Sequence, residues 1–372
     1  MDDQTRLATD AGKAIGGGEG ASYQPPQLAS PSFVAPTLTQ RVGPFAHELL
    51  LFVVLVVGLI WAKQIAPLFM TVTTQQQLLF NVWDLALLSL PMTYIIITGG
   101  IDLSVASTMG LSAVVMGMCF QLWHWPMWAA ALMAVVTGTA GGLLNGVFVA
   151  KIKVHPLIVT LATYSAYRGL AEGLSLGFAS LYKTTSVYSG FPTWFTNLGQ
   201  KAFFAGPDLR HPHWYALSAA GWLFIAAAIA MGVVLAKGPF GRTLYAVGHN
   251  ETAARFSGLK VGRAKLLIYA LSGLASGLAS LNNAAEYNTA QANMATNLEL
   301  DVITAVVLGG TSIFGGRGRI IGTVLGVALI HETREFVSWH YHDNTLIRLV
   351  LGSLLIVAVA INALLGRRSS RK

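Results

Sequence analysis

Long apolar runs separated by short polar stretches make up the chain from about residue 45 onward. A run of about 18 or more mostly apolar residues is typical of a helix that crosses a bilayer. The pattern predicts about ten membrane spans. They lie near Ala46–Trp61, Leu78–Thr98, Val105–Leu122, Met127–Ala150, Leu157–Leu174, Trp214–Ala236, Leu266–Ala285, Leu298–Leu308, Ile320–Ile330 and Leu346–Leu365.

The eighth run, Leu298–Leu308, is too short for a full crossing. It either begins earlier or is a broken helix that meets the turn at Gly309–Ser312. Between the fifth and sixth spans, residues from about 177 to 213 are expected to form a long loop rich in aromatic residues and proline.

The composition supports an all-α, polytopic membrane protein. Hydrophobic residues make up 54% of the chain and charged residues 11%, against about 25% charge in ordinary soluble domains. Residues 1–44 differ from the rest, because they are rich in Gly, Ser, Pro and Thr. Such a segment buries too little apolar surface to order itself, and we expect a disordered cytoplasmic tail.

Basic residues indicate how the spans are oriented, because short cytoplasmic loops of membrane proteins are enriched in Lys and Arg. With ten crossings and the N-terminus inside, every dense basic cluster lies in the cytoplasm, and both termini lie there too. The clusters are Lys151/Lys153, the segment Lys237–Lys265, Arg317/Arg319 and the C-terminal group Arg367, Arg368, Arg371 and Lys372. The net charge of +8 is therefore explained by membrane topology and does not indicate nucleic-acid binding.

The segment Lys237–Lys265 is predicted to contain a short helix. Asn250 is a good N-cap residue, Glu251 places negative charge in the first turn, and Gly258 is suited to a left-handed C-cap. A helix of about two turns does not persist alone in water. We expect the flanking spans to hold it and present it to a soluble partner. The alternative is an ordinary positive-inside loop.

Polar residues within or at the ends of spans are candidates for a solute path, because ionisable groups in a membrane are costly and usually functional. Carboxylates and amides bind the hydroxyls of a sugar, and aromatic rings stack on its C–H surface. Each residue has a structural alternative: Asp102 can cap the third span, and the others can hydrogen-bond between helices. The candidates are Asn81, Trp83, Asp84, Asp102, Asn282, Asn283 and Glu286.

Three further patterns are more readily structural. Glycines at 138, 142 and 146 form a small-residue stripe for close helix packing, which Ser and Gly residues of the seventh span match. Arg168 and Glu172 lie four residues apart and are placed to pair. His331, Glu332, Glu335, His340, His342 and Asp343 are expected in an outer loop, but their spacing fits no standard metal motif.

The sequence predicts no enzyme. It contains no GxxxxGK[S/T] motif, so this chain alone does not hold ATP phosphates in the P-loop manner. Neither catalytic residues nor sites for a cofactor or metal are assigned. The single cysteine, Cys119, lies in an apolar run and excludes a disulfide framework within one chain.

The chain resembles the ribose-permease-like family, the membrane subunits of bacterial ABC importers for monosaccharides, which includes rhamnose and autoinducer-2 transporters. Four stretches carry the resemblance, and with the order of spans they cover about residues 50–365. They are TGGIDLSVAS (98–107), HPLIVTLATYSAYRGL (155–170), GRTLYAVGHNETAARFSGLKV (241–261) and VLGGTSIFGGRGRIIGTVLG (307–326).

The resemblance implies a type II-like importer fold in the bacterial inner membrane. It implies three kinds of partner: a second permease chain, a cytoplasmic ATPase pair that binds ATP and Mg²⁺, and a periplasmic sugar-binding protein. It divides the chain into a tail (1–44), a transmembrane permease domain (45–366) with a coupling segment (237–265), and a basic C-terminal tail (367–372). The implied ATPase-coupling residues are Gly241, Arg242, Asn250, Glu251, Ala253, Ala254, Arg255 and Gly258.

Two other classes stay open. An ion-gradient-driven secondary transporter of a small polar solute would use Asp84, Asp102 or Glu286. An intramembrane enzyme is disfavoured, because the residues show no catalytic arrangement.

Overall fold

A computed structural model describes residues 45–183, 185–201 and 217–369. The chain divides into two units, residues 1–44 and residues 45–372. The first unit is the predicted tail, and it lies outside the described residues. The described part is mostly helical, with one two-stranded antiparallel ribbon of β1 (Tyr188–Ser189) and β2 (Thr289–Ala290). This agrees with the all-α class.

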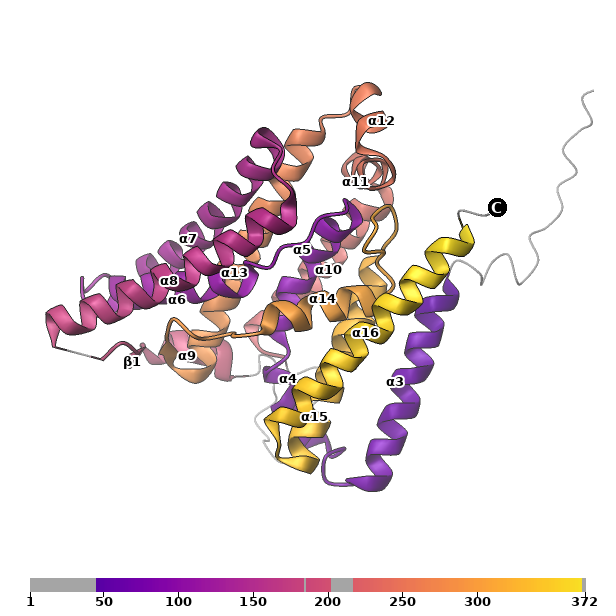
Figure 1. Cartoon of the computed structure of the whole chain (residues 1–372). Helices are drawn as coiled ribbons and strands as arrows, with labels where there is room; N and C mark the ends of the chain where they lie inside the picture. Colours follow the sequence, from indigo (N-terminus) through magenta and orange to yellow (C-terminus); the bar gives the residue numbers. More distant parts are fainter. Residues whose placement is uncertain (1–44, 184, 202–216, 370–372) are drawn as a thin grey trace, which may run out of the picture. The chain divides into compact units, whose positions relative to one another are not determined.

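The helices follow one another with few long connections (Figure 1). They are α3 (Ala46–Ile65), α4 (Val72–Phe80), α5 (Trp83–Ile97), α6 (Val105–Gln121), α7 (Met127–Val147), the π-helical turn η2 (Phe148–Ile152), α8 (Pro156–Tyr182), α9 (Thr193–Gln200), α10 (Ala219–Lys237), α11 (Pro239–His249), α12 (Glu251–Phe256), α13 (Val261–Tyr287), α14 (Leu298–Leu308), α15 (Ile320–Tyr341) and α16 (Asn344–Ser369).

Helix α5 lies at the centre of the bundle, and every one of its residues is buried. It packs against α13, α14, α15 and α10. Its sequence, WDLALLSLPMTYIII, is mostly apolar on all sides, as expected of a helix with no exposed face, and its few polar side chains are buried with it. Helix α3 is the opposite case. It packs mainly on α15 and exposes most of its apolar side chains, as a helix facing lipid does.

As predicted, the glycine stripe of α7 lets another helix approach closely, and in the structure this helix is α13. A Cβ atom on Gly138 would overlap the carbonyl oxygen of Gly273, and one on Gly142 would overlap that of Tyr269. Only residues without a side chain let the two backbones approach this closely. The small residues of α13 thus form one face of a closely packed helix pair.

Several predicted boundaries are wrong. The second span is broken at Asn81–Val82 into α4 and α5, which are bent by 57°. The region expected to be a loop after Gly177 begins with the end of α8 and contains α9, which packs on α13; part of it, residues 202–216, lies outside the described chain. Helix α15 continues to Tyr341, so the His/acid-rich group belongs to a helix up to that point and not to a loop.

By length and composition, four helices of the described chain are suited to cross a membrane: α3, α7 continued by η2, α10 and α13. The bent pair α4–α5 makes a fifth when it is counted as one span. Helix α14 has only 11 residues and the same bounds as the short eighth run of the sequence. Helix α8 is long enough for a span but carries two charged residues, Arg168 and Glu172, in its middle. The protein is therefore a multi-pass helical membrane protein, and the count of ten spans stays a prediction.

Candidate functional site

Asp84 is the centre of a polar cluster in the first turn of α5. Its Oδ1 accepts a hydrogen bond of 2.8 Å from Nδ2 of Asn282, and its Oδ2 accepts one of 2.7 Å from Nδ2 of Asn283. Both amides come from α13. Adjacent residues of a helix point about 100° apart, so the two side chains hold the carboxylate from two directions. Asp84 is thereby fixed in position without a cation as its partner in these bonds.

A third hydrogen bond closes the rim of the cluster. The Tyr287 hydroxyl donates to Oδ1 of Asn81 over 3.0 Å. Asn81 is the C-cap of α4 and lies at the bend of 57° that separates α4 from α5. The break therefore turns a polar side chain inward at the level of Asp84.

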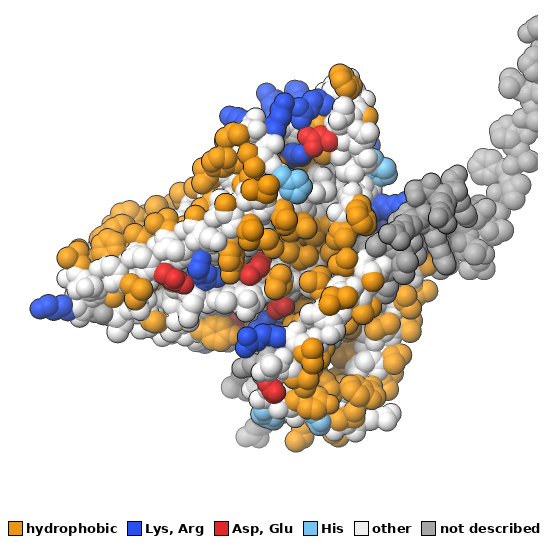
Figure 2. Space-filling model, viewed as in Figure 1, with side chains coloured by type: hydrophobic (Ala, Val, Ile, Leu, Met, Phe, Trp, Pro, Cys, Tyr) orange, Lys and Arg blue, Asp and Glu red, His pale blue; other side chains and the backbone are white. Residues whose placement is uncertain are grey.

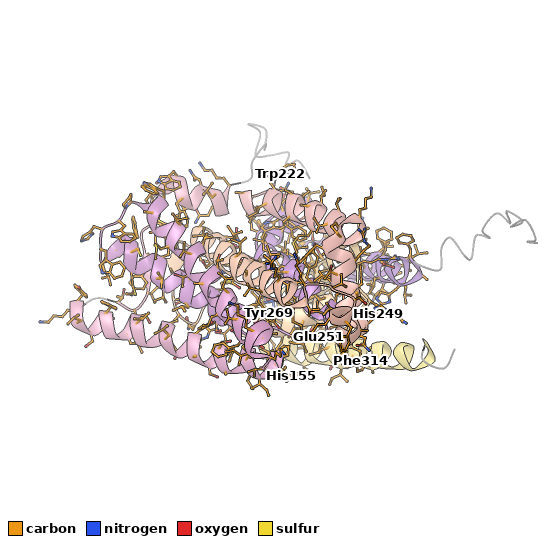
Figure 3. All side chains as sticks on the ribbon, turned by 90° about the horizontal axis from the view of Figure 1, so that it is seen from above. His155, Trp222, His249, Glu251, Tyr269 and Phe314 are labelled. Atoms are coloured by element: carbon orange, nitrogen blue, oxygen red, sulfur yellow. The ribbon has the colours of Figure 1, made fainter. Side chains whose placement is uncertain are left out.

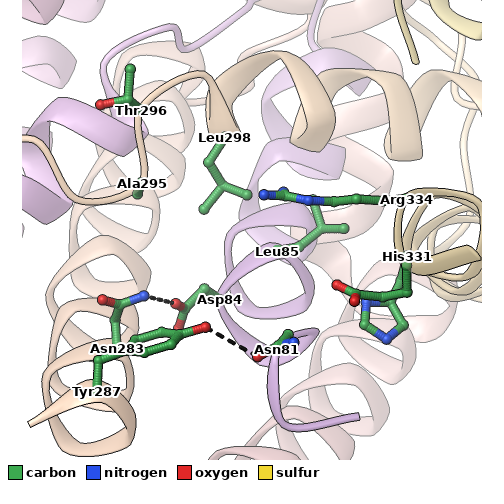
Figure 4. A pocket seen from close by; sticks show the side chains of 11 residues that line it. Asn81, Asp84, Leu85, Asn283, Tyr287, Ala295, Thr296, Leu298, His331 and Arg334 are labelled. Carbon is green, nitrogen blue, oxygen red and sulfur yellow. Dashed lines mark hydrogen bonds between the residues drawn. The ribbon is translucent and has the colours of Figure 1, made fainter. Parts of the chain in front are cut away.

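These residues line a cavity of about 220 Å³, the Asp84 pocket (Figure 4). Its polar wall consists of Asn81, Asp84, Asn283, Tyr287, Thr296, His331, Arg334 and Glu335. Leu85, Ala295 and Leu298 form an apolar side. The wall is supplied by the end of α4, by α5, by α13, by the start of α14 with the segment before it, and by α15. Hydrogen-bonding groups beside a smaller apolar surface suit a small hydroxylated solute.

The structure unites some predicted path residues and separates others. Asn81, Asp84 and Asn283 line the pocket, and Asn282 supports Asp84 from behind it. Trp83 points elsewhere: its ring packs on Phe224 with centroids 6.0 Å apart. Glu286 is not part of the pocket wall either. Its main-chain carbonyl accepts a hydrogen bond from the side chain of Gln200 on α9.

Asp102 has a structural role in this conformation. Its Oδ1 accepts from the main-chain nitrogen of Ser104 (2.9 Å) and from the Ser104 hydroxyl (2.7 Å), while Oδ2 accepts from Ser272 (2.8 Å). Asn145 extends the network by donating to the Ser104 hydroxyl. Asp102 does not cap α6, because Ser104 is the N-cap and no side chain accepts from the first turn. The network instead joins the start of α6 to α7 and α13.

The predicted pair of Arg168 and Glu172 is wrong. Among the described residues, Arg168 donates instead to the main-chain carbonyls of Ala292 and Met294. The spacing of four residues was compatible with a pair, but the irregular segment before α14 offers acceptors that only the fold brings near. Arg168 thus anchors that segment, which supplies part of the pocket wall.

The basic segment forms two helices, and Figure 2 shows Lys and Arg side chains gathered there, at the end of the molecule where α11 and α12 lie. As predicted, Asn250 caps α12: its Oδ1 accepts from the main-chain nitrogen of Ala253 over 2.9 Å. Gly258 ends the helix with φ of +80°. Ala254 faces inward and packs with Val247 and Val261. The prediction missed α11, which precedes α12 and has its own apolar face.

Glu251 ties α12 to its surroundings. It pairs with Lys265 of α13 over 2.6 Å and with Arg255 of its own helix over 2.9 Å. Partial burial raises the pKa of Glu251, but the hydrogen bonds and positive charges of Lys265 and Arg255 outweigh it, so the pKa lies below the ordinary glutamate value. The carboxylate is therefore ionised at neutral pH and holds the helix on α13.

The remaining predicted residues of this segment differ in their roles. A Cβ atom on Gly241 would overlap the Leu235 carbonyl, so this glycine permits the tight corner between α10 and α11. Arg242 is exposed and reaches only the Lys237 carbonyl over 3.3 Å.

A comparison of the sequence with protein families identifies the kind of protein. Residues 75–359 match the family described as the permease component of branched-chain amino acid transport systems. The chain belongs to this permease family. The match covers the Asp84 pocket, α11 and α12, so the sites described above lie inside the family's shared part.

Individual relatives of the permease cover nearly the same region. This chain is 34% identical to the ribose import permease protein RbsC of Bacillus subtilis over 336 residues, which are 89% of this chain and 94% of the relative. It is 32% identical to the autoinducer 2 import system permease protein LsrD of Yersinia enterocolitica over 286 residues, 76% of this chain and 82% of that one. LsrD of Escherichia coli O9:H4 is also 32% identical, over 318 residues, 85% of this chain and 91% of that one.

The sequence interpretation did not recognise His331, Arg334 and Glu335 as residues of the permease's pocket. His331 and Glu335 were expected in an outer loop, whereas all three residues lie on one face of α15. The spacing i, i+3, i+4 is the helical signal that could have shown this. Arg334 reaches across the pocket toward Leu298 (Figure 4) and pairs with Asp301 over 3.1 Å.

A further residue of the permease missed by sequence reasoning is Phe256, the last residue of α12, which is 88% exposed.

Within the described residues no three His, Cys, Asp or Glu side chains gather as a metal site.

Proposed function

We propose that this permease moves a small hydroxylated solute of the monosaccharide class, such as ribose, rhamnose or autoinducer-2, into a bacterial cell. The observation that carries the proposal is the fixed carboxylate of Asp84 in a pocket of amides and a tyrosine. Relatives whose names specify ribose and autoinducer 2 support the same class.

The pocket fits a sugar better than the amino acid that the family description mentions. A zwitterionic amino acid needs a cation for its carboxylate and an anion for its ammonium group. Here Arg334 already pairs with Asp301, and both oxygens of Asp84 accept from amides. Hydroxyl groups can instead share lone pairs of Asp84 and contact Asn283 and Tyr287 without breaking an ion pair.

The proposed arrangement is a type II-like fold with ten crossings in the bacterial inner membrane and both termini in the cytoplasm. The basic segment of α11 and α12 supports the cytoplasmic placement of that end. Residues 1–44 and 367–372 would then be cytoplasmic tails around the permease domain; the first tail and residues 370–372 lie outside the described residues.

ATP energy would reach the permease through α12, because ATP and Mg²⁺ bind to a separate ATPase subunit. The exposed ring of Phe256 beside Arg255, which is 47% exposed, supports a docking role for this helix. An aromatic anchor next to an arginine is typical of the energetic centre of a protein interface.

A second permease chain and a periplasmic sugar-binding protein complete the proposed complex. The second permease is supported by α8, whose glycines at 169, 173 and 177 have no atom within 4 Å of a Cβ position. Glu172 is exposed on the same helix. A carboxylate facing lipid is unfavourable, so a protein partner on this side would relieve that cost.

Reconstitution tests the proposal against an ion-driven transporter. The permease is placed in vesicles with and without its ATPase subunit and binding protein, and uptake of labelled ribose, rhamnose and leucine is measured. We expect sugar uptake only with the ATPase and ATP. Uptake driven by an ion gradient without an ATPase would refute the mechanism, and preference for leucine would refute the solute class.

The coupling role of α12 has its own test. Arg255→Glu is expected to leave the permease inserted but to disconnect ATP hydrolysis from uptake, because it reverses the charge of the docking surface. Lys183→Glu is the matched control, because it reverses an exposed charge at the end of α8, outside the coupling segment. Full sugar uptake by the Arg255 variant would exclude this role.

A further inference from the structure

The three helices that bring Asp84, Leu298 and Arg334 to the pocket converge again at their opposite ends. Helix α5 starts beside the pocket and ends at Ile97 about 22 Å away, taking 15 residues at 1.5 Å each. Helix α14 also starts at the pocket and ends at Leu308, and α15 starts at Ile320 and reaches the pocket in its later turns.

The convergence point is a tight junction with α11. The main-chain nitrogen of Gly316, in the turn between α14 and α15, donates to the Ile97 carbonyl over 2.8 Å. A Cβ atom on Gly248 of α11 would overlap this same carbonyl and the Gly316 nitrogen. Gly316 has φ of +75°, which glycine adopts without strain. Three chain segments thus meet backbone to backbone.

Side chains of α11 hold the turn from the other side. The Tyr245 hydroxyl donates to the Gly318 carbonyl over 2.7 Å. The His249 ring lies against Gly316, with its Nδ1 2.7 Å from where a Cβ would be. Figure 3 views this end of the molecule and labels His249 and Phe314, which belongs to the same turn. Helix α11 therefore contacts both the end of α5 and the turn that leads into α15.

We propose that the contact of Ile97, Gly248 and Gly316 is a gate at the end of α5 opposite the pocket, and that Tyr245 and Gly248 are positioning residues that hold it closed. Helix α11 is continuous with the docking helix α12 through Asn250 alone, so a displacement of α12 moves α11 directly. Withdrawal of α11 would remove the contacts of Gly248 and Tyr245 that hold the turn against the end of α5. The hydrogen bond from Gly316 to Ile97 would then lack support from α11, and the helices at this end could separate. The inference rests on the proposed coupling through α12 for its trigger, but the gate itself is tested without an ATPase or a sugar.

A buried cysteine reports whether the gate is open. Thr93 of α5 lies between the pocket and the junction, and its hydroxyl bonds to that of Thr323 on α15 over 2.7 Å. Replacement of the single native cysteine, Cys119→Ala, followed by Thr93→Cys, gives one reporter thiol. Permease vesicles of each orientation are treated with a membrane-impermeant maleimide, so that labelling is measured from each side separately.

Gly248→Ala forces α11 away from Ile97 and is expected to raise reporter labelling at least tenfold from the side of α11 only. The control is Gly262→Ala, where a Cβ has its nearest neighbour, the Ala150 carbonyl, at an ordinary 3.7 Å. Equal labelling in both variants, or a rise from both sides alike, would overturn the gate, since general loosening does not prefer one side.

Tyr245→Phe provides the second variant in case Gly248→Ala does not fold. It removes only the hydroxyl, and we expect about fivefold faster one-sided labelling, the change that one net hydrogen bond of about 1 kcal/mol provides. Thr243→Ala is its control, because that hydroxyl bonds only within α11, to the Pro239 carbonyl. Unchanged labelling in Tyr245→Phe would count against the gate even if reconstituted sugar uptake proved ATP-driven.

Discussion

Lys265→Met is expected to loosen α12 from α13 without unfolding the permease. The Lys265 side chain is 13% exposed and its ammonium lies 2.6 Å from Glu251, whose side chain is 39% exposed. After allowance for solvent screening at the half-exposed carboxylate, such a pair contributes about 1 kcal/mol. Its loss should increase local opening of α12 about fivefold, because 1.4 kcal/mol corresponds to a factor of about ten.

The matched control is Arg255→Met, which removes the other partner of Glu251. That pair is an exposed i, i+4 contact within α12 and contributes only about 0.3–0.5 kcal/mol, or about a twofold change. Amide hydrogen exchange of residues 251–256 in the permease alone measures both variants, because exchange through local opening follows its free energy. Equal effects of the two variants would refute the assignment of Lys265 as the tether.

The same tether predicts a dependence on pH. The pKa of Glu251 is lowered in the folded protein, so its stabilisation is present above the unfolded pKa of about 4.3 and is lost as pH falls through the folded value. Wild type and Lys265→Met should therefore differ in exchange at pH 7, after correction for intrinsic rates, and converge in the acidic range below about pH 4. A difference that persists there would show that Lys265 acts by packing and not by charge.

Three further changes test other parts of the structure. Gly142→Leu drives a side chain into the α13 backbone and should destabilise the permease by about 1–3 kcal/mol in thermal unfolding, whereas Gly58→Leu, in open space, should change little. Asn250→Ala removes the cap on Ala253 and should cost α12 about 1 kcal/mol, seen as faster local exchange with an unchanged unfolding midpoint. Asp84→Asn leaves one of two buried amides without an acceptor and should lower sugar uptake at least about tenfold while ATPase binding persists; normal uptake would remove Asp84 from the path.

Local chemistry explains what could be predicted from the sequence. The cap at Asn250 and the left-handed Gly258 depend on residues within a few positions of each other, so their types decide the outcome. The glycine stripe of α7 was predictable because its period places all three residues on one helix face. The bounds of α14 were predictable for the same reason, because its run of apolar residues ends at the two consecutive glycines Gly309 and Gly310.

Longer-range features required the tertiary structure. Arg168 finds acceptors more than 120 positions away, and no spacing rule could choose them over Glu172. The pocket joins Asp84 to Asn283, about 200 positions later, and to Arg334.

The sequence by itself therefore determined that this is a multi-pass helical permease with a capped basic helix, because hydrophobicity, charge and capping act over a few residues. Only the tertiary structure decided which polar groups share a cavity and which turn α11 closes, because those contacts depend on how whole helices pack.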